Sequence, residues 1–309
     1  ADGRIAVVGG RNIGDEYFSA ATDTNFIDLD ALVVGSAVRQ AEAIFDEFWN
    51  GNAAIPLQAL KQAKPGAVER LRAQMAEADR RLHDHAYIRR LRASTGIAEF
   101  VRGVRPLYWP RHLEVLSDPA SKGQGGGEPR WLVHPLAAAM SQARGSLQLV
   151  SPYFVPGERG IEFLRQLRAR GVAVDVLTNS LAATDVLAVH SGYAPYRKRL
   201  LEAGVALHEQ KPGGVQDSSL FGSSGASLHT KAFIVDDAAG FIGSFNIDPR
   251  SISLNTEMGL LFRDREATAA LLAVYRDKTD PRHAYRLRLE DGALRWDDAA
   301  ATSLEQALD

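Results

Sequence analysis

The sequence contains no cysteine and is nearly neutral, and both features narrow the range of functions. Without cysteine, the chain of 309 residues forms no disulfide bond, uses no thiolate chemistry and holds no cysteine-ligated zinc. It has 36 Lys and Arg residues against 38 Asp and Glu residues, a formal net charge of −2. Domains that bind nucleic acid usually carry a basic excess, so the charge gives no support to a nucleic-acid partner.

Long apolar runs are also missing. No stretch reaches the roughly 18 consecutive apolar residues of a membrane-spanning helix, and no secretory signal peptide is visible. The first residue is Ala1 rather than Met, so we expect the natural chain to begin further upstream. Apolar residues still make up 45 % of the sequence and charged residues 24 %, a composition typical of a globular protein with a sizeable core.

Two short segments share one pattern at a constant offset of 234 residues. The first is DGRIAVVGGRN, residues 2–12, and the second is DDAAGFIGSFN, residues 236–246. Both begin with Asp, have Gly at the same internal position, end with Asn and are followed by Ile. Matching residue types at matching spacing favour an internal duplication.

The spacing of apolar residues predicts regular elements before a glycine-rich boundary. Residues 4–8 and 26–34 are expected to be strands, and residues 37–49 an amphipathic helix. Residues 65–93 are expected to form a highly charged helix that begins at a proline. The segment SDPASKGQGGGEPR, residues 117–130, concentrates glycine and proline, which predicts a loop or a lobe boundary.

After this segment strands and helices alternate, which predicts an α/β fold. Strands separated by helices imply a mixed, largely parallel sheet covered by helices on both faces. We assign residues 1–125 to the C-terminal part of an incomplete first lobe and residues 126–309 to a second lobe. The second lobe is expected to have strands within 147–156, 172–180, 205–211, 232–237 and 240–244, and helices at 160–171 and 184–203.

Polar residues whose side chains are suited to catalysis are concentrated in SLHTKAFIVDDAAGFIGSFNIDPRS, residues 227–251. His229 and Lys231 are two residues apart, so on one strand they share a face, and Asn246 can reach that face after the next strand. This set suits a phosphate: Lys supplies charge, Asn supplies N–H donors, and His supplies nucleophilicity or proton transfer. Glu257 begins a further strand and is expected behind the histidine, where a carboxylate fixes the ring tautomer.

Each of these residues alone has a simpler interpretation as a packed histidine, an exposed lysine or a turn. Their joint spacing favours the functional one, because two buried cationic groups on one strand face need a reason. Asp236 lies beyond the strand end and is expected to brace the turn rather than contact substrate. Asp2, Gly243 and Ser244 are expected to have structural roles in the motifs.

The segment HTKAFIVDDAAGFIGSFN resembles the HKD motif of the phospholipase D superfamily, and DGRIAVVGGRN resembles the tail of a first HKD motif. The resemblance covers nearly the whole chain and is closest to the C-type branch of the bacterial cardiolipin synthases. The other segments that carry it are GGRNIGDEYF, SPYFVPGERG, LTNSLAATDVLAVHSGYAPYRKRLLEAGV, GSFNIDPRS and LNTEMG.

The resemblance implies two lobes whose HKD motifs meet at the lobe interface. One His would form a phosphohistidine, and the other would protonate the departing alcohol and then activate the acceptor. The implied product is cardiolipin, made from phosphatidylglycerol and a second phospholipid, either phosphatidylglycerol or phosphatidylethanolamine. No cofactor and no metal is implied. The expected location is peripheral, at the bacterial inner membrane and on its cytoplasmic side.

The resemblance also assigns roles to residues of this chain. His229 is the expected general acid/base, and Asp28 the expected carboxylate behind the histidine of the first motif, with Asp30 as an alternative. By the repeat offset, the first His and Lys would lie upstream of Ala1, so we expect this chain to be inactive alone unless a homodimer pairs two copies of His229. The residues carried over as catalytic are His229, Lys231, Asn246, Glu257, Asn12 and Asp28.

Four further residues follow predicted strand ends and are expected to contact substrate. They would line a pocket for the headgroup or the acyl chains, because ligands collect at the carboxyl ends of strands. These residues are Tyr153, Thr178, Asn179 and Asp185.

Two other functions stay open at this point. The same half-site suits a phosphodiesterase that hydrolyses lipid or nucleic acid, although the neutral charge disfavours a nuclease. A non-catalytic, membrane-associated or regulatory module is the other alternative. The expected partners are phospholipids, a membrane surface and a second copy of the chain, with no nucleic acid.

Overall fold

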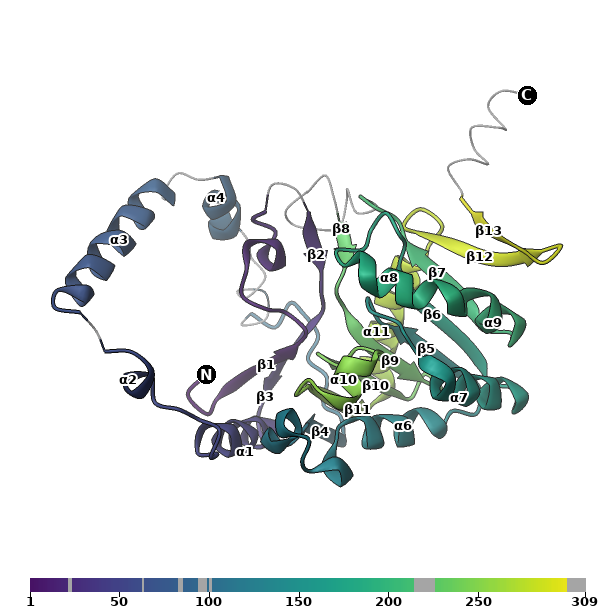
Figure 1. Cartoon of the computed structure of the whole chain (residues 1–309), viewed down its shortest axis with the longest axis horizontal. Coiled ribbons are helices and arrows are strands. Elements are labelled where there is room, and N and C mark those ends of the chain that lie inside the picture. The colour runs from purple at the N-terminus through teal and green to yellow at the C-terminus, as the bar shows by residue number, and fades with distance from the viewer. Residues whose placement is uncertain are drawn as a thin grey trace.

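A nine-stranded sheet organises the second half of the chain together with one strand from the first half (Figure 1). The computed structural model describes residues 1–21, 24–62, 64–82, 86–93, 99, 102–213 and 226–298. The strand order is β13-β12-β7-β6-β5-β9-β10-β11-β4. These strands are β4 (His112–Ser117), β5 (Ser146–Val150), β6 (Ala173–Asn179), β7 (Ala206–Gln210), β9 (Lys231–Val235), β10 (Ala239–Gly243), β11 (Met258–Arg263), β12 (Ala284–Glu290) and β13 (Ala293–Asp297).

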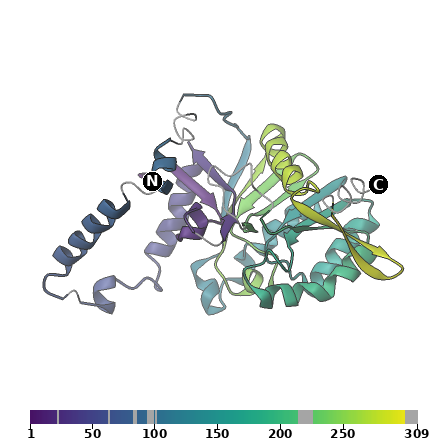
Figure 2. The ribbon, with the colours of Figure 1, turned by 90° about the horizontal axis from the view of Figure 1, so that it is seen from above.

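Helices cover both faces of this sheet (Figure 2). The central strand β9 is buried at every position: Phe233 and Val235 pack into one core, and Ala232 and Ile234 into the other. Alternating side chains of one strand therefore supply two cores. The helices of this half are α6 (Val133–Ser141), α7 (Gly157–Ala169), α8 (Leu187–Tyr193), α9 (Arg197–Glu202), α10 (Pro249–Ser253) and α11 (Arg265–Lys278).

The first part of the chain packs beside this sheet through short strands. β1 (Ile5–Gly9) and β3 (Asp30–Val34) form an antiparallel ribbon, and β2 (Asn25–Ile27) pairs in parallel with β8 (Ala226–Leu228). Figure 1 shows α2 and α3 lying away from the sheet. The helices of this part are α1 (Ala37–Trp49), α2 (Leu57–Leu60), α3 (Ala67–Leu82) and α4 (Ala86–Ala93).

The expected α/β class is confirmed, but the expectation of a largely parallel sheet is wrong. Within the described sheet, only β5–β6 and β6–β7 pair in parallel. The strands β9, β10, β11 and β4 pair antiparallel with one another, and β9 is antiparallel to β5. Only residues 236–238 join β9 to β10, and a parallel pair needs a much longer crossover.

The individual elements also test the sequence predictions. The strand at 4–8 and the helix at 37–49 are confirmed by β1 and α1. The strand expected at 26–34 is interrupted at residues 28 and 29, since β2 pairs with β8 and β3 pairs with β1. At this break the Asp28 carboxylate accepts a hydrogen bond from Leu29 N (2.9 Å). The helix expected at 184–203 is divided into α8, a 3₁₀ turn at Ala194–Tyr196 and α9.

Both repeated segments begin with the same backbone turn. Asp2 and Gly3 have φ of 52° and 62°, and Asp236 and Asp237 have φ of 52° and 50°. Two successive residues with positive φ are the mark of a tight hairpin turn. The repeat therefore extends to backbone conformation. The division into lobes at residue 125 stays a prediction, and β4, which precedes it, pairs with β11 of the second lobe.

A close approach of β10 and β11 generates the first prediction. Gly243 lies opposite Gly259, and a Cβ on Gly259 would overlap the Phe241 ring and lie 2.9 Å from Ile242 O. We expect Gly259→Ala to lower the free energy of unfolding by about 1–3 kcal/mol, because the packed core has to move. Chemical denaturation measures the change. Gly123→Ala is the control, with open space around its Cβ, and an equal loss there would contradict the prediction.

Candidate active site

The imidazole of His229 contacts a carboxylate from the far end of the chain. Its Nδ1 lies 2.7 Å from Asp28 Oδ2, and Asp28 is fully buried at its side chain. The pairing of β2 with β8 brings the two residues together, because the backbone N–H groups of His229 and Thr230 both donate to Ile27 O. An ionised carboxylate can only accept, so the shared proton lies on Nδ1 and leaves Nε2 for chemistry.

Two aromatic rings hold the other sides of the imidazole. The ring centroids of Tyr17 and Phe26 lie 5.1 Å and 5.0 Å from that of His229. The two rings also contact each other, at 4.7 Å. Sequence reasoning missed both residues, because neither lies in an HKD motif. The available signals were their position between Asn12 and Asp28 and, for Tyr17, its place in the segment GGRNIGDEYF that carries the family resemblance.

The predicted pairing of carboxylates with histidines is wrong. Glu257 was expected behind His229, and Asp28 behind the histidine of the first motif. Instead, Asp28 contacts His229, whereas Glu257 accepts hydrogen bonds from Ser244 Oγ (2.5 Å) and Ser251 Oγ (2.9 Å). The parallel pairing of β2 and β8 crosses between the repeats, which spacing along one chain cannot reveal. The alternative, Asp30, pairs with Arg11 at 2.5 Å.

Lys231 is a buried cation at the start of β9. Its side chain donates to His229 O, and the residue is 3 % exposed. Burial lowers the pKa of Lys231 to about 8, although nearby carboxylates act to raise it. These carboxylates belong to Asp28, Glu257, Asp185 and Asp248. Glycine at position 10 permits this packing, because a Cβ there would lie 3.0 Å from Lys231 Cδ and 3.3 Å from Asp28 Oδ1.

The two predicted catalytic asparagines differ in environment. Asn246 is 7 % exposed, and its Oδ1 has no hydrogen-bond partner among the described residues. A buried amide oxygen without a partner is costly unless a ligand or water meets it. Asn12 is exposed and donates to the hydroxyl of Tyr17 at 3.1 Å, so it is linked to His229 through that ring.

The residues expected to be structural make structural contacts. The Asp236 carboxylate accepts from the backbone N–H groups of residues 144–146. Partial burial acts to raise the pKa of Asp236, but these hydrogen bonds outweigh it and the net pKa is lowered. Gly243 permits the close approach of β11. Ser244 Oγ donates a hydrogen bond to the Glu257 carboxylate and accepts one from Met258 N. Asp2 lies in the turn before β1.

The four residues expected to contact substrate fall into two pairs. Tyr153 OH donates to Asp185 Oδ2 at 2.7 Å. The pKa of Tyr153 is raised well above its usual value, mainly by burial and secondly by this hydrogen bond. Thr178 Oγ1 donates to a backbone carbonyl, and both ends of the Asn179 amide bind the backbone of Leu228 at 2.9 Å. Asn179 therefore holds β8, which carries the chain into His229.

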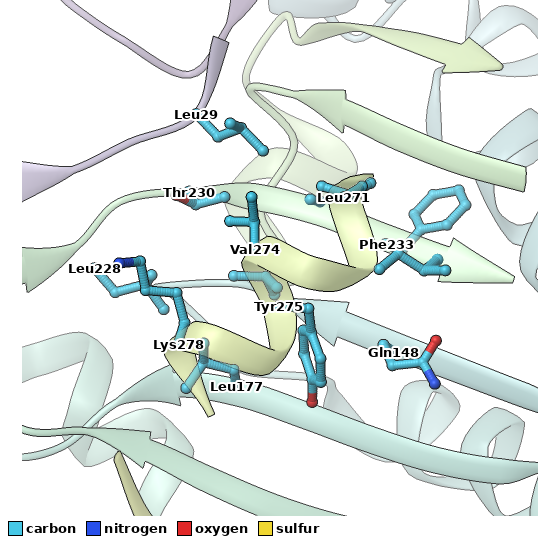
Figure 3. Close-up of a pocket in the computed structure, with 13 residues that line it drawn as sticks. Leu29, Gln148, Leu177, Leu228, Thr230, Phe233, Leu271, Val274, Tyr275 and Lys278 are labelled. Carbon is cyan, nitrogen blue, oxygen red and sulfur yellow. The ribbon is translucent and has the colours of Figure 1, made fainter. Parts of the chain in front are cut away.

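A small cavity lies behind β9, between the sheet and α11 (Figure 3). Its free volume of about 20 Å³ matches a single water molecule and is too small for an acyl chain. The labelled residues that line it include Leu29, Leu228 and Thr230, which neighbour the site. Within the described ranges, no three His, Asp or Glu side chains converge in a way that could hold a metal ion.

The chain is similar to known proteins in sequence and in fold. Residues 136–277 match the family model described as cardiolipin synthase, PLD-like domain. The sequence is also 39 % identical to cardiolipin synthase C of Escherichia coli over 97 % of this chain. Residues 136–277 form a phospholipase D-like domain of the kind found in cardiolipin synthases. It spans 64 % of the length of the Escherichia coli relative.

A more distant relative and a solved structure extend the comparison. Cardiolipin synthase 2 of Bacillus cereus is 26 % identical over 89 % of this chain and 43 % of its own length. The crystal structure of phosphatidylserine synthase from Haemophilus influenzae superposes with a TM-score of 0.58 at 16 % identity. That match covers 93 % of this chain and 61 % of the other, and it establishes the shared fold.

The contact between Asp28 and His229 gives a second prediction. Asp28→Asn removes the charge that stabilises an imidazolium and permits the wrong ring tautomer. We expect turnover by the complete protein to fall by about 10²–10⁴-fold. Steady-state kinetics measures the loss. Asp30→Asn is the matched control, since Asp30 pairs with Arg11 and not with His229. Equal effects of the two variants would overturn the assignment.

The buried lysine gives a third prediction, on pH. Because the pKa of Lys231 is lowered to about 8, its ammonium loses a proton as pH rises through that value. If this charge binds the phosphate, kcat/KM should fall on the alkaline side with a midpoint near that pKa. A pH–rate profile tests this, and Lys231→Met should abolish activity across the range. An alkaline limb that begins only near the ordinary lysine pKa would contradict the prediction.

Proposed function

We propose that this protein transfers phosphatidyl groups between phospholipids and forms cardiolipin. The observation that carries the proposal is a buried His229 whose Nδ1 is bound to Asp28 beside the buried cation Lys231. This arrangement combines a proton-transfer group with a positive charge that favours a phosphodiester. Similarity to the cardiolipin synthases supports the lipid substrate.

In the proposed first step, the histidine of a first HKD motif attacks the phosphorus of the donor lipid. A nitrogen–phosphorus bond forms as the bond from phosphorus to the leaving alcohol oxygen breaks. His229 Nε2 gives its proton to that oxygen, and Asp28 stabilises the imidazolium before the transfer. Lys231 and the Asn246 amide stabilise the charge on the phosphoryl oxygens.

In the second step, a hydroxyl of phosphatidylglycerol replaces the leaving alcohol. Its proton passes to His229 Nε2, its oxygen bonds to phosphorus, and the nitrogen–phosphorus bond breaks. His229 and Lys231 are the only His-x-Lys pair in the sequence. The proposal therefore includes a first motif supplied from outside the 309 residues, so that this chain alone is inactive.

The proposed donors are phosphatidylglycerol and phosphatidylethanolamine, and the proposed location is the cytoplasmic face of the bacterial inner membrane. Contact with a membrane surface follows from substrates of this kind. Among the residues that the structure describes, no helix is both long and apolar enough to span a bilayer. A homodimer that pairs two copies of His229 is the alternative to an outside first motif, and such a dimer would make the 309-residue chain active by itself.

A lipid analysis tests the proposal. Bacterial cells that lack cardiolipin would carry the complete reading frame, either unchanged or with His229→Ala. We expect mass spectrometry to detect cardiolipin only with the unchanged frame, because the variant has no group to move the proton. The loss should be at least about 10²-fold.

The control variant is His112→Ala, which removes an exposed histidine of β4. It should make cardiolipin at the level of the unchanged protein. Phosphatidic acid without cardiolipin would instead indicate a lipid hydrolase, and cleavage of nucleic acid would indicate a nuclease. Either result would reject the transferase.

A further inference from the structure

A fully buried ion pair lies in the glycine-rich segment before α6. Lys122 Nζ is 2.8 Å from Asp118 Oδ2, and both side chains are 0 % exposed. The nitrogen also lies 5.3 Å from the centre of the Trp131 ring. The sequence had marked this segment only as a loop or boundary, and no step of the proposed reaction uses it.

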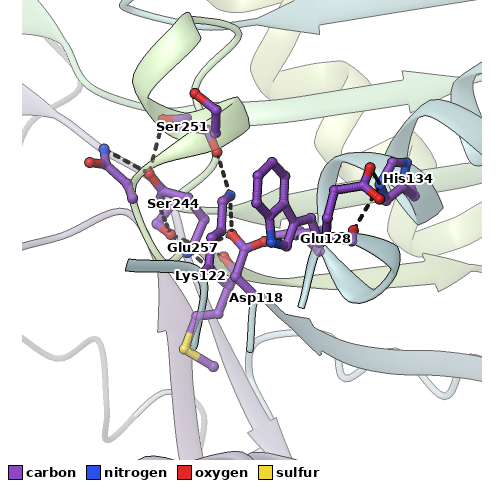
Figure 4. A network of polar contacts seen from close by, with 12 residues as sticks. Asp118, Lys122, Glu128, His134, Ser244, Ser251 and Glu257 are labelled. Carbon is purple, nitrogen blue, oxygen red and sulfur yellow. Dashed lines mark hydrogen bonds and ion pairs between the residues drawn. The ribbon is translucent and has the colours of Figure 1, made fainter. Parts of the chain in front are cut away.

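This ion pair holds Glu257 and α10 at several points (Figure 4). Asp118 N donates to Glu257 O at 2.8 Å, and Asp118 Oδ2 accepts from Glu257 N at 2.9 Å. The other carboxylate oxygen, Oδ1, accepts from Leu132 N at 2.7 Å. Lys122 Nζ donates to Ser251 O at 2.8 Å. Both backbone groups of Glu257 are therefore fixed by one aspartate.

The side chain of Glu257 extends from the backbone that Asp118 binds toward the candidate site. Its carboxylate is bound by Ser244, Ser251 and Asn255, the last at 3.3 Å. Ser244, which binds this carboxylate, directly follows the β10 residue that pairs with Lys231 of β9, so the strand pairing places the carboxylate near the lysine. The Glu257 charge accordingly acts to raise the pKa of Lys231. The ion pair thus binds the backbones of Ser251 and Glu257, the same two residues whose side chains bind each other.

We propose that Asp118 and Lys122 are positioning residues that hold the Glu257 carboxylate beside the phosphate-binding Lys231. This role rests on the proposed function, because it concerns residues that position the same active site. Stability alone is a weak reason for the pair, because desolvating two charges often cancels their attraction, and apolar residues of equal volume serve as well. A fixed carboxylate next to a buried ammonium is a stronger reason.

The charges that face Lys231 define the expected signal. If the Glu257 carboxylate moves away, one favourable interaction with the Lys231 ammonium is lost and the pKa of Lys231 falls. Of the other groups that face Lys231, Asp28, Asp185 and the backbone carbonyl of His229 have no contact with the ion pair. Asp248 caps α10 and binds Ser251, so any displacement of Asp248 would lower the pKa of Lys231 in the same direction.

The test uses a double variant, Asp118→Asn with Lys122→Met, which leaves no unpaired buried charge. We expect it to fold, with kcat of the complete protein lowered by about 100-fold and KM nearly unchanged, because a displaced catalytic group affects the reacting state most. The alkaline limb of its pH–rate profile should move to lower pH. The matched control is Arg197→Met with Glu209→Gln, which removes a buried ion pair (2.7 Å) elsewhere in the fold.

A second readout needs no activity. The ¹³Cε signal of Lys231, identified by its absence in Lys231→Met, can be titrated by NMR in the 309-residue protein. The pKa of Lys231 should be lower in the double variant than in the unchanged and control proteins. An unchanged Lys231 titration would overturn the positioning role. A complete protein that makes no cardiolipin while the Lys231 titration still shifts would instead reject the proposed function alone.

Discussion

The candidate site depends on one contact between residues 201 positions apart, His229 with Asp28. Neither residue lies in the interior of a strand. Asp28 interrupts the chain between β2 and β3, and His229 follows β8 directly. The parallel pairing of β2 with β8 places Asp28 beside His229. The backbone N–H groups of His229 and Thr230 donate to Ile27 O and fix the register of the two strands. The chemistry of the imidazole thus depends on three residues of strand pairing.

Around this contact the site balances burial against charge. Lys231 is buried deeply enough to lose much of its hydration, which favours the neutral amine. Four carboxylates act in the opposite sense and favour the ammonium. A phosphodiester substrate would bring a further negative charge close to these carboxylates. A Lys231 side chain that is positively charged at neutral pH would attract it. Within the described part of the chain, the buried amide oxygen of Asn246 has no hydrogen-bond partner, so it is a position where a ligand or water would be stabilised.

The scaffold of the site is built from close backbone approach. Gly10 allows the first repeat to pack against Lys231 and Asp28, and Gly243 and Gly259 allow β10 and β11 to meet. Glu257, directly before β11, is then held on its backbone side by the ion pair of Asp118 with Lys122. Both backbone groups of Glu257 are hydrogen-bonded to Asp118, so the backbone from which its carboxylate extends has a fixed position.

The sequence alone determined the class of the fold and the helix at 37–49, because these depend on local periodicity. Residue type and spacing also selected His229, Lys231, Asn246 and Glu257 as candidate site residues, and Asp236 as a structural one. Only the tertiary structure decided which carboxylate meets which histidine, that the sheet is mainly antiparallel, and that Lys122 is buried. The physical reason is that strand pairing and burial join segments that are distant in sequence, and spacing along the chain records neither.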